Sequence, residues 1–119
     1  MPTPAFQDKV TGVVGTKRWV ADIAADADPN TGVWVYVAGG WQVYGGTSVA
    51  SPIVAGITNA AGRFLGSTDS ELRTIYASLG TTAFYDVKQG KCGSRSRYAA
   101  AAGYDFCTGV GSPRGLTGE

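Results

Sequence analysis

The sequence of 119 residues contains no histidine, and this absence restricts its possible chemistry more than any other feature. A Ser-His-Asp triad uses an imidazole to accept the proton of the serine, so residues of this chain cannot form one by themselves. Zinc sites are built largely from cysteine and histidine, and the chain has two cysteines. Histidine-based catalysis and a four-ligand zinc site within the chain are therefore both excluded.

Strong charge and long hydrophobic runs are also missing. Ten basic and nine acidic residues give a net charge of +1, so no strong field indicates a nucleic-acid or membrane partner. No apolar run approaches the roughly 20 residues of a membrane-spanning helix, and the N-terminus shows no signal-peptide core. Eighteen glycines and 44% hydrophobic residues indicate a single compact, turn-rich α/β domain rather than a disordered chain.

The octet Gly45–Pro52 (GGTSVASP) carries the clearest chemical signal. Its two glycines allow a tight turn and the close approach of a substrate. The N-terminus of the helix that follows offers free N–H groups, which favour a developing oxyanion. Ser48 is therefore the candidate nucleophile. The alternative is an ordinary capped helix start, with Thr47 or Ser48 as the N-cap.

Apolar patterns predict three strands in the first half of the chain. Arg18–Ala25 has the composition of a short buried strand, followed by a turn rich in Asp, Pro and Gly. Gly32–Val37 alternates β-branched and aromatic side chains, and Trp41–Tyr44 follows a glycine turn, so the two segments are expected to form a hairpin. Met1–Lys9 contains two prolines and is expected to be a frayed start or a truncation point.

Two helices are expected in the second half of the chain. The apolar residues along Ile53–Phe64 predict one helix, with Pro52 in its first turn. Thr68 and Glu71 have the spacing of a capping box. The apolar residues after this box recur with helical period, which predicts an amphipathic helix that ends at Gly80.

Several segments together resemble the sedolisins, or serine-carboxyl peptidases, which share a fold with the subtilisins. Both groups have a Gly-Thr-Ser-x-Ala-x-Pro motif like that within Gly45–Pro52, so this motif does not separate them. Val20–Gly32 is similar to the sedolisin segment Pro-Asp-Val-Ser-Ala-x-Ala-Asp-Pro-x-Thr-Gly. Phe84–Val87 and Gly103–Pro113 resemble the two halves of the family's calcium site. This two-part pattern favours the sedolisins over the subtilisins.

The resemblance implies an α/β protein with a partial subtilisin-like doubly wound fold, its C-terminal portion, and a calcium-binding loop. It assigns residues 18–116 to the C-terminal portion of a peptidase catalytic domain. Residues 1–17 are then a poorly determined N-terminal segment, and residues 117–119 are a tail. The resemblance also implies a secreted, extracellular protein, although this chain carries no signal peptide.

One Ca²⁺ ion is expected at this loop by resemblance. Asp86 and Asp105 would supply carboxylates, and the carbonyl groups of Val87, Ala101 and Gly103 would complete the site with water. Calcium takes about six to eight oxygen ligands, which suits this donor set. Ala101 stands where relatives often have glycine, which is tolerated if the backbone there does not need positive φ. The alternative is that both aspartates form surface turns.

Cys92 and Cys107 lie on either side of the predicted metal loop. A disulfide between them would stabilise the fold by roughly 3 kcal/mol on the loop-entropy model, and it favours an oxidising compartment. Two unpaired buried thiols are the alternative.

The proton acceptor for Ser48 is not found in the sequence. A sedolisin activates its serine with a glutamate oriented by an aspartate, and another aspartate lies near the oxyanion; all three lie upstream in the family. Glu71 and Glu119, the two glutamates of this chain, have a different sequence context, and its early aspartates belong to the Val20–Gly32 segment. The chain alone is therefore expected to be inactive, because an unassisted serine hydroxyl is a weak nucleophile.

These features predict the C-terminal fragment of a serine-type endopeptidase. Its partners would be a peptide or protein substrate and the missing N-terminal part of the catalytic domain, with no nucleic acid and no membrane. The alternatives are a non-catalytic, calcium-stabilised fragment or pseudoenzyme that acts by binding, and a subtilisin-type fragment.

Overall fold

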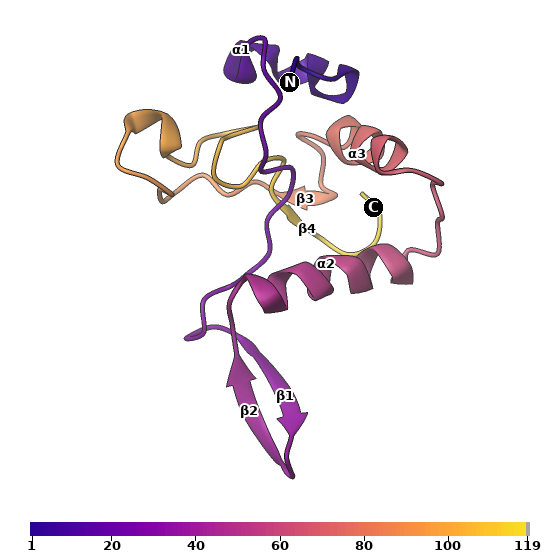
Figure 1. The fold of residues 1–119 in the computed structure, drawn as a ribbon, viewed down its shortest axis with the longest axis vertical. Helices are drawn as coiled ribbons and strands as arrows, with labels where there is room; N and C mark the ends of the chain where they lie inside the picture. Colours follow the sequence, from indigo (N-terminus) through magenta and orange to yellow (C-terminus); the bar gives the residue numbers. More distant parts are fainter. Residues whose placement is uncertain (119) are drawn as a thin grey trace.

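The computed structural model describes residues 1–118. Figure 1 shows a folded body that holds both chain ends, a helix that passes beneath it and a hairpin that projects away from it. In chain order the elements are η1 (Ala5–Val10), α1 (Thr11–Val14), β1 (Val33–Val37), β2 (Gly40–Tyr44), α2 (Thr47–Ala60), α3 (Thr68–Ala77), β3 (Phe84–Tyr85), η2 (Ser96–Tyr98) and β4 (Ser112–Pro113).

The core of the body combines segments from both ends of the chain. Its buried apolar side chains come from η1, α1, α3, β3 and the C-terminal loop, and they are Val10, Val14, Ile75, Tyr76, Phe84, Tyr104 and Val110. The expected frayed start at Met1–Lys9 is wrong. Ala5–Val10 forms a 3-10 helix that packs against α3, and Gln7 within it is fully buried.

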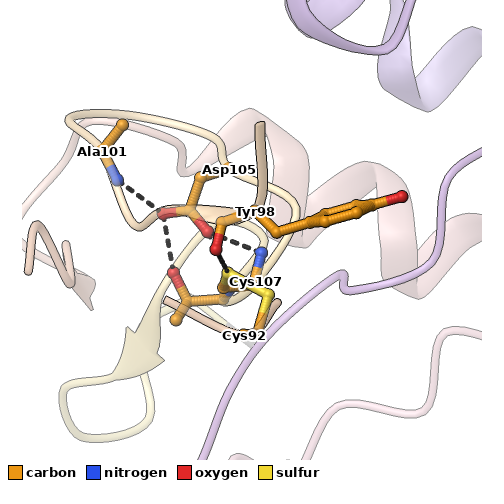
Figure 2. Close-up of a disulfide and its surroundings, with 6 residues drawn as sticks. Cys92, Tyr98, Ala101, Asp105 and Cys107 are labelled. Carbon is orange, nitrogen blue, oxygen red and sulfur yellow. Dashed lines mark hydrogen bonds between the residues drawn. A yellow bond between two sulfur atoms is a disulfide. The ribbon is translucent and has the colours of Figure 1, made fainter. Parts of the chain in front are cut away.

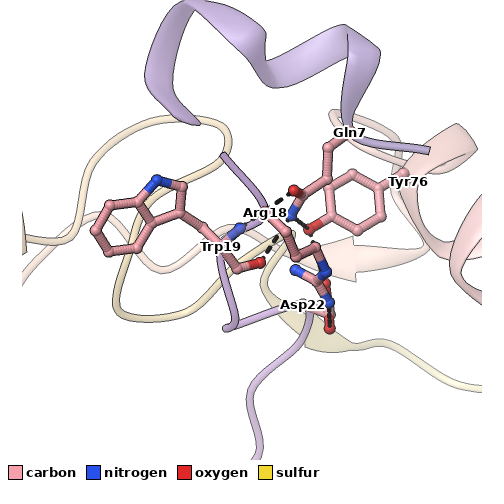
Figure 3. Close-up of polar contacts among 5 residues, drawn as sticks. All are labelled: Gln7, Arg18, Trp19, Asp22 and Tyr76. Carbon is pink, nitrogen blue, oxygen red and sulfur yellow. Dashed lines mark hydrogen bonds and ion pairs between the residues drawn. The ribbon is translucent and has the colours of Figure 1, made fainter. Parts of the chain in front are cut away.

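A buried hydrogen-bond network attaches this N-terminal segment to α3 (Figure 3). The Gln7 side-chain amide donates to the Tyr76 hydroxyl over 2.7 Å and to the Trp19 carbonyl over 2.8 Å. The Tyr76 hydroxyl donates in turn to Asp22 over 2.8 Å, and Arg18 forms an ion pair of 2.7 Å with the other oxygen of that carboxylate. Burial raises the pKa of Tyr76, which keeps its hydroxyl protonated as a donor.

The strand predicted over Arg18–Ala25 is wrong. This segment has no neighbouring strand, so it runs as irregular chain across the body. Its backbone instead bonds to the C-terminal loop, where the Asp22 carbonyl accepts from Val110 over 2.8 Å and Ala24 donates to Gly111 over 2.9 Å. An apolar segment becomes a β-strand only where a second strand lies beside it and supplies a regular series of backbone hydrogen bonds.

The predicted hairpin is confirmed. β1 and β2 pair antiparallel with Val33 opposite Tyr44 and Val37 opposite Gly40, whereas β3 and β4 form a second, two-residue antiparallel pair. The sheets of residues 1–118 are both two-stranded and antiparallel, so the doubly wound parallel sheet is not found in this part of the chain. Such a sheet needs several strands joined by crossover connections.

The helix expected over Ile53–Phe64 has different limits. α2 begins at Thr47 and ends at Ala60, and Pro52 lies inside it rather than in its first turn. Its N-cap is Gly46, with φ of 92°, so neither Thr47 nor Ser48 is the cap. Among residues 1–118, no helix is long and apolar enough to cross a bilayer.

Strands β1 and β2 and helix α2 form what we call the uncovered face. No residue of α2 is buried, and Trp34 and Trp41 of the hairpin are 67% and 66% exposed. The accessible surface of 7375 Å² is about 1,300 Å² larger than that of a compact protein of this size. The radius of gyration, 15.3 Å, likewise exceeds the roughly 13.5 Å expected. The body is folded, but this side of the chain lacks a covering layer within residues 1–118.

Helix α3 matches its prediction except at its ends. The capping box is placed one residue too late, because Ser67 is the N-cap and its Oγ accepts from the Ser70 N–H over 3.1 Å. The helix ends at Ala77, and the chain continues as turns to Gly80, whose φ is +77°.

Replacing Ser67 by alanine should lower the free energy of unfolding by about 1 kcal/mol, because the Ser70 N–H loses its acceptor. Thr68→Ala, one residue along, removes an exposed side chain that is not the cap and should change stability little. Urea unfolding of both variants provides the measurement. A larger loss for Thr68→Ala than for Ser67→Ala would show that the helix begins one residue later.

Candidate functional site

Ser48 lies in the first turn of α2, at the point where the hairpin joins the helix, and it is exposed. The Gly46 carbonyl accepts from the Val49 and Ala50 N–H groups over 2.9 and 3.2 Å. The N–H groups of Thr47 and Ser48 therefore precede the first bonds of the helix, and the positive end of the helix dipole is directed at the same place. This arrangement suits stabilisation of an oxyanion beside the Ser48 hydroxyl.

Pro52 makes this first turn unusual. Residue 52 is the position whose N–H would normally donate to the carbonyl of Ser48, and proline has no N–H. The helix therefore continues past Ser48 without that bond. Gly46 supplies the positive φ that redirects the chain from β2 into α2, and its N–H donates to the Ala27 carbonyl over 2.6 Å.

Ser48 borders an open groove of about 660 Å³ on the uncovered face. The groove lies between β1 and the start of α2, and most of its lining is aliphatic. The lining residues are Val33, Val35, Val37, Tyr44, Gly45, Ser48, Val49, Pro52 and Ile53. This lining contains no acidic residue, so no carboxylate of residues 1–118 borders the groove to accept the serine proton. The groove thus combines an exposed serine at a helix N-terminus with a lining that contains no acidic residue.

The aspartates that lie closest in sequence are engaged in their own turn. An Asp26 oxygen accepts from the Asp28 N–H over 2.9 Å, and this hydrogen bond lowers the pKa of Asp26. Asp28 accepts from the backbone and side-chain N–H groups of Asn30 over 2.9 and 2.8 Å. Glu71 lies in α3, and Glu119 lies outside the described residues. Of the described acidic positions, Asp26, Asp28 and Glu71 do not line the groove beside Ser48.

The sequence did not reveal that the turn at residues 26–32 supports the turn at residues 45–48, which we call the serine turn. A Cβ on Gly45 would overlap the backbone of Pro29, so glycine is required there for the two turns to touch. The bond from Gly46 to Ala27 makes the same connection. The only available signal was the occurrence of Val20–Gly32 and Gly45–Pro52 in one family pattern.

Asp105 is the centre of the predicted metal loop, and it is 3% exposed. Figure 2 shows its carboxylate among backbone donors. One oxygen accepts from the N–H groups of Cys107 and Thr108, both over 2.8 Å. The other accepts from the Ala101 N–H and the Thr108 hydroxyl, both over 3.1 Å. Four donors fill the roughly four lone-pair positions of a carboxylate. Asp105 therefore organises the loop from a buried position, and Thr108 is a partner that the sequence analysis did not single out.

Asp86 has the complementary property of an unpaired oxygen. Its Oδ2 accepts from the Gly103 N–H over 3.0 Å and lies 3.7 Å from Lys88 Nζ. Its Oδ1 is buried and has no hydrogen-bond partner among the described residues. A buried carboxylate oxygen without a partner is unfavourable. A bound cation would satisfy this oxygen.

The backbone conformation agrees with the residue types found at two of the expected ligand positions. Ala101 is absent from the non-glycine residues with positive φ, which within residues 1–118 are Ala21 and Ala38, so alanine is acceptable where relatives often have glycine. Gly103 has φ of +79° and does use the freedom of glycine. Residues 1–118 contain no cluster of three or more Asp, Glu, Cys or His side chains suited to a metal. Carbonyl oxygens and water would therefore supply most ligands, as calcium allows.

Cys92 and Cys107 form the disulfide that the sequence left as one of two possibilities (Figure 2). Their Cα atoms are 5.5 Å apart, and they are separated by 15 positions in the sequence. Cys92 follows the Asp86 half of the metal loop, and Cys107 belongs to the Asp105 turn. The disulfide therefore joins the two halves covalently.

Comparison with known proteins gives relatives along nearly the whole chain. Kumamolisin of Bacillus sp. (strain MN-32) is 34% identical over 124 residues, which covers 97% of this chain and 22% of kumamolisin. Xanthomonalisin of Xanthomonas sp. (strain T-22) is 36% identical and sedolisin of Pseudomonas sp. (strain 101) is 36% identical, each over 92% of this chain. The chain spans 13% and 19% of these two relatives. No family model matches the chain.

A solved structure agrees with these relatives. Pseudomonas sedolisin, a serine-carboxyl proteinase in complex with two molecules of pseudo-iodotyrostatin, superposes with a TM-score of 0.67 at 34% identity. The match covers 94% of this chain and 31% of that structure, which supports a subtilisin-like fold for the region. Sequence and three-dimensional structure thus agree over the same part of the relatives, and over that part the chain belongs to the sedolisin family of serine-carboxyl peptidases.

Proposed function

We propose that this chain is the nucleophile-bearing C-terminal portion of a serine-carboxyl endopeptidase. The observation that carries the proposal is the exposed Ser48 at the N-terminus of α2, in a chain related to peptidases over nearly its full length. Ser48 Oγ would attack the carbonyl carbon of a peptide bond while its proton passes to a carboxylate supplied from outside the chain. The Thr47 and Ser48 N–H groups would stabilise the oxyanion, and water would then release the acyl group.

The missing carboxylate would come with the polypeptide that covers the uncovered face. The surface excess of about 1,300 Å² is larger than the roughly 800 Å² that one partner contributes to a standard stable interface. The groove beside Ser48 is part of this face. The remaining part of a sedolisin-type catalytic domain suits this role, because it would bring the acidic residues and an apolar surface together.

A second candidate is a non-catalytic chain that acts by binding. It is favoured by one observation, the lack of any acidic residue in the lining of the Ser48 groove. The two candidates differ in what happens when the rest of a catalytic domain is supplied.

A chimera that places this chain after the preceding part of the kumamolisin catalytic domain should cleave peptides at acidic pH. The chain alone should show no cleavage, because loss of the base in a serine protease lowers the rate by as much as about 10⁶-fold. Ser48→Ala should abolish the activity of the chimera, whereas Ser51→Ala, an exposed serine one turn further along α2, should retain it. The measurement is hydrolysis of a peptide library with product identification.

Two results would contradict the proposal. A folded chimera without activity would favour the binding function, and cleavage by the isolated chain that Ser48→Ala abolishes would show that the base lies within it.

We also propose that the loop binds one Ca²⁺ ion. The buried, unpaired Oδ1 of Asp86 supports a cation there, and the carbonyl groups of Val87, Ala101 and Gly103 are the further donors. Asp105 could join the ion by exchanging one of its four hydrogen bonds. The ion would neutralise the two carboxylates and hold the two halves of the loop together. Secretion is part of the same proposal, since the disulfide suits an oxidising compartment.

Calcium should raise the stability of the chain, by about 2.7 kcal/mol when its free concentration is 100 times the dissociation constant. Asp86→Asn should remove most of this gain, because the buried oxygen would lose its charge. Asp69→Asn is the matched control, since Asp69 is exposed and pairs with Arg73 on α3. Urea unfolding with calcium and with a chelator measures the gain. Full retention of the gain in Asp86→Asn would place the ion elsewhere.

A further inference from the structure

We propose that the Cys92–Cys107 disulfide positions the metal loop, so that calcium affinity and resistance of the disulfide to reduction are thermodynamically linked. The inference rests on the proposed calcium site. It concerns two residues that neither the proposed catalytic chemistry nor the proposed ligand set uses.

The first contact that supports the inference is at Cys107. Its backbone N–H donates to Asp105 over 2.8 Å, so the residue that carries the sulfur also orients a carboxylate of the site. Asp105 is 3% exposed and has its lone pairs filled by neighbouring donors. Displacement of Cys107 would therefore disturb a buried, fully bonded group rather than a free surface side chain.

The second contact is at Cys92, which reaches the opposite side of the site. The Cys92 N–H donates to the Tyr98 carbonyl over 2.9 Å, and Ala100 donates to Gly90 over 2.9 Å. These hydrogen bonds join the segment that follows Asp86 to the segment that precedes Ala101. Ala101 then donates to Asp105 over 3.1 Å. The disulfide closes this path by joining the Cys92 side directly to the Asp105 turn.

Without the disulfide, the two halves are held together by the two-residue β3–β4 pair, by the contact of the Tyr98 ring with Phe106 and by a few hydrogen bonds. The bond from the Gly103 N–H to Asp86 is one of them, and each such bond contributes about 0.5–1.5 kcal/mol. The 92–98 loop contains mainly exposed residues, and its ring contacts are confined to Arg97 and Tyr98, which lie against Trp19 and Phe106. In the reduced chain the two halves of the loop would separate part of the time. Calcium binding would then have to bring them together, which weakens its affinity.

The size of the effect follows from the contacts that orient metal ligands. Loss of such contacts typically weakens metal affinity about 10- to 100-fold. Coupling between two equilibria is reciprocal, so calcium must disfavour reduction of the disulfide by the same factor. A tenfold factor corresponds to about 30 mV for this two-electron couple. With dithiothreitol as reductant, two thiols form on Cys92 and Cys107 while dithiothreitol closes to its cyclic disulfide.

The test is a redox titration of the wild-type chain. The fraction of Cys92–Cys107 disulfide is measured in buffers of reduced and oxidised dithiothreitol, with saturating Ca²⁺, with Mg²⁺ and with chelator. The expected result is a midpoint about 30 mV or more lower with Ca²⁺ than with chelator, and a smaller shift with Mg²⁺. Isothermal titration of Ca²⁺ into the oxidised chain and into the Cys92→Ser/Cys107→Ser variant should show at least tenfold weaker binding by the variant.

Ser67→Ala separates this local effect from general loss of stability. It weakens the α3 cap and leaves the loop unchanged, so its oxidised form should bind Ca²⁺ like the wild type. If the oxidised wild type binds Ca²⁺ but the midpoint does not move, the inference is wrong and the calcium site stands. If the oxidised wild type does not bind Ca²⁺, the proposed calcium site and the inference are both wrong.

Discussion

The hydrogen bond from the Tyr76 hydroxyl to Asp22 is the contact on which the folded body depends. It holds Asp22 between α3 and the C-terminal loop, where the Asp22 carbonyl also accepts from Val110. Gln7 approaches from the N-terminal side and donates to the same hydroxyl. A buried polar group left without its partner costs about 1–3 kcal/mol. Three segments far apart in sequence therefore stabilise one another.

The body and the uncovered face meet at the serine turn. Backbone contacts within the chain fix the position of Ser48, since Gly45 packs on Pro29 and Gly46 donates to Ala27. The side of Ser48 that borders the groove has no such support. The chain thus fixes the position of Ser48 through its own backbone contacts, and no acidic residue of its described part lines the groove beside this serine.

The sequence was sufficient where local patterns decide the structure. Alternation predicted the hairpin, helical period predicted α3, and one of two open possibilities was the disulfide that formed. The sequence was insufficient where contacts between distant residues determine the structure. The burial of Gln7 depends on Tyr76, 69 positions away, which no local pattern reveals. The start of α2 depends on the positive φ of Gly46, and the segment Arg18–Ala25 found no strand to pair with. The four hydrogen bonds that the Asp105 carboxylate accepts could not be predicted either, because the donors come together only in the folded loop.

The hairpin has a consequence for the behaviour of the chain in concentrated solution. Residues 33–44 contain no charged side chain and no proline, and both outer edges of β1 and β2 lack a neighbouring strand within residues 1–118. Natural proteins usually protect such edges with lysine, proline or a bulge, because unpaired edges recruit further strands. These unprotected edges are therefore the expected site of association between copies of this chain. A polypeptide that covered the hairpin, as proposed above for the rest of a catalytic domain, would protect these edges from such association.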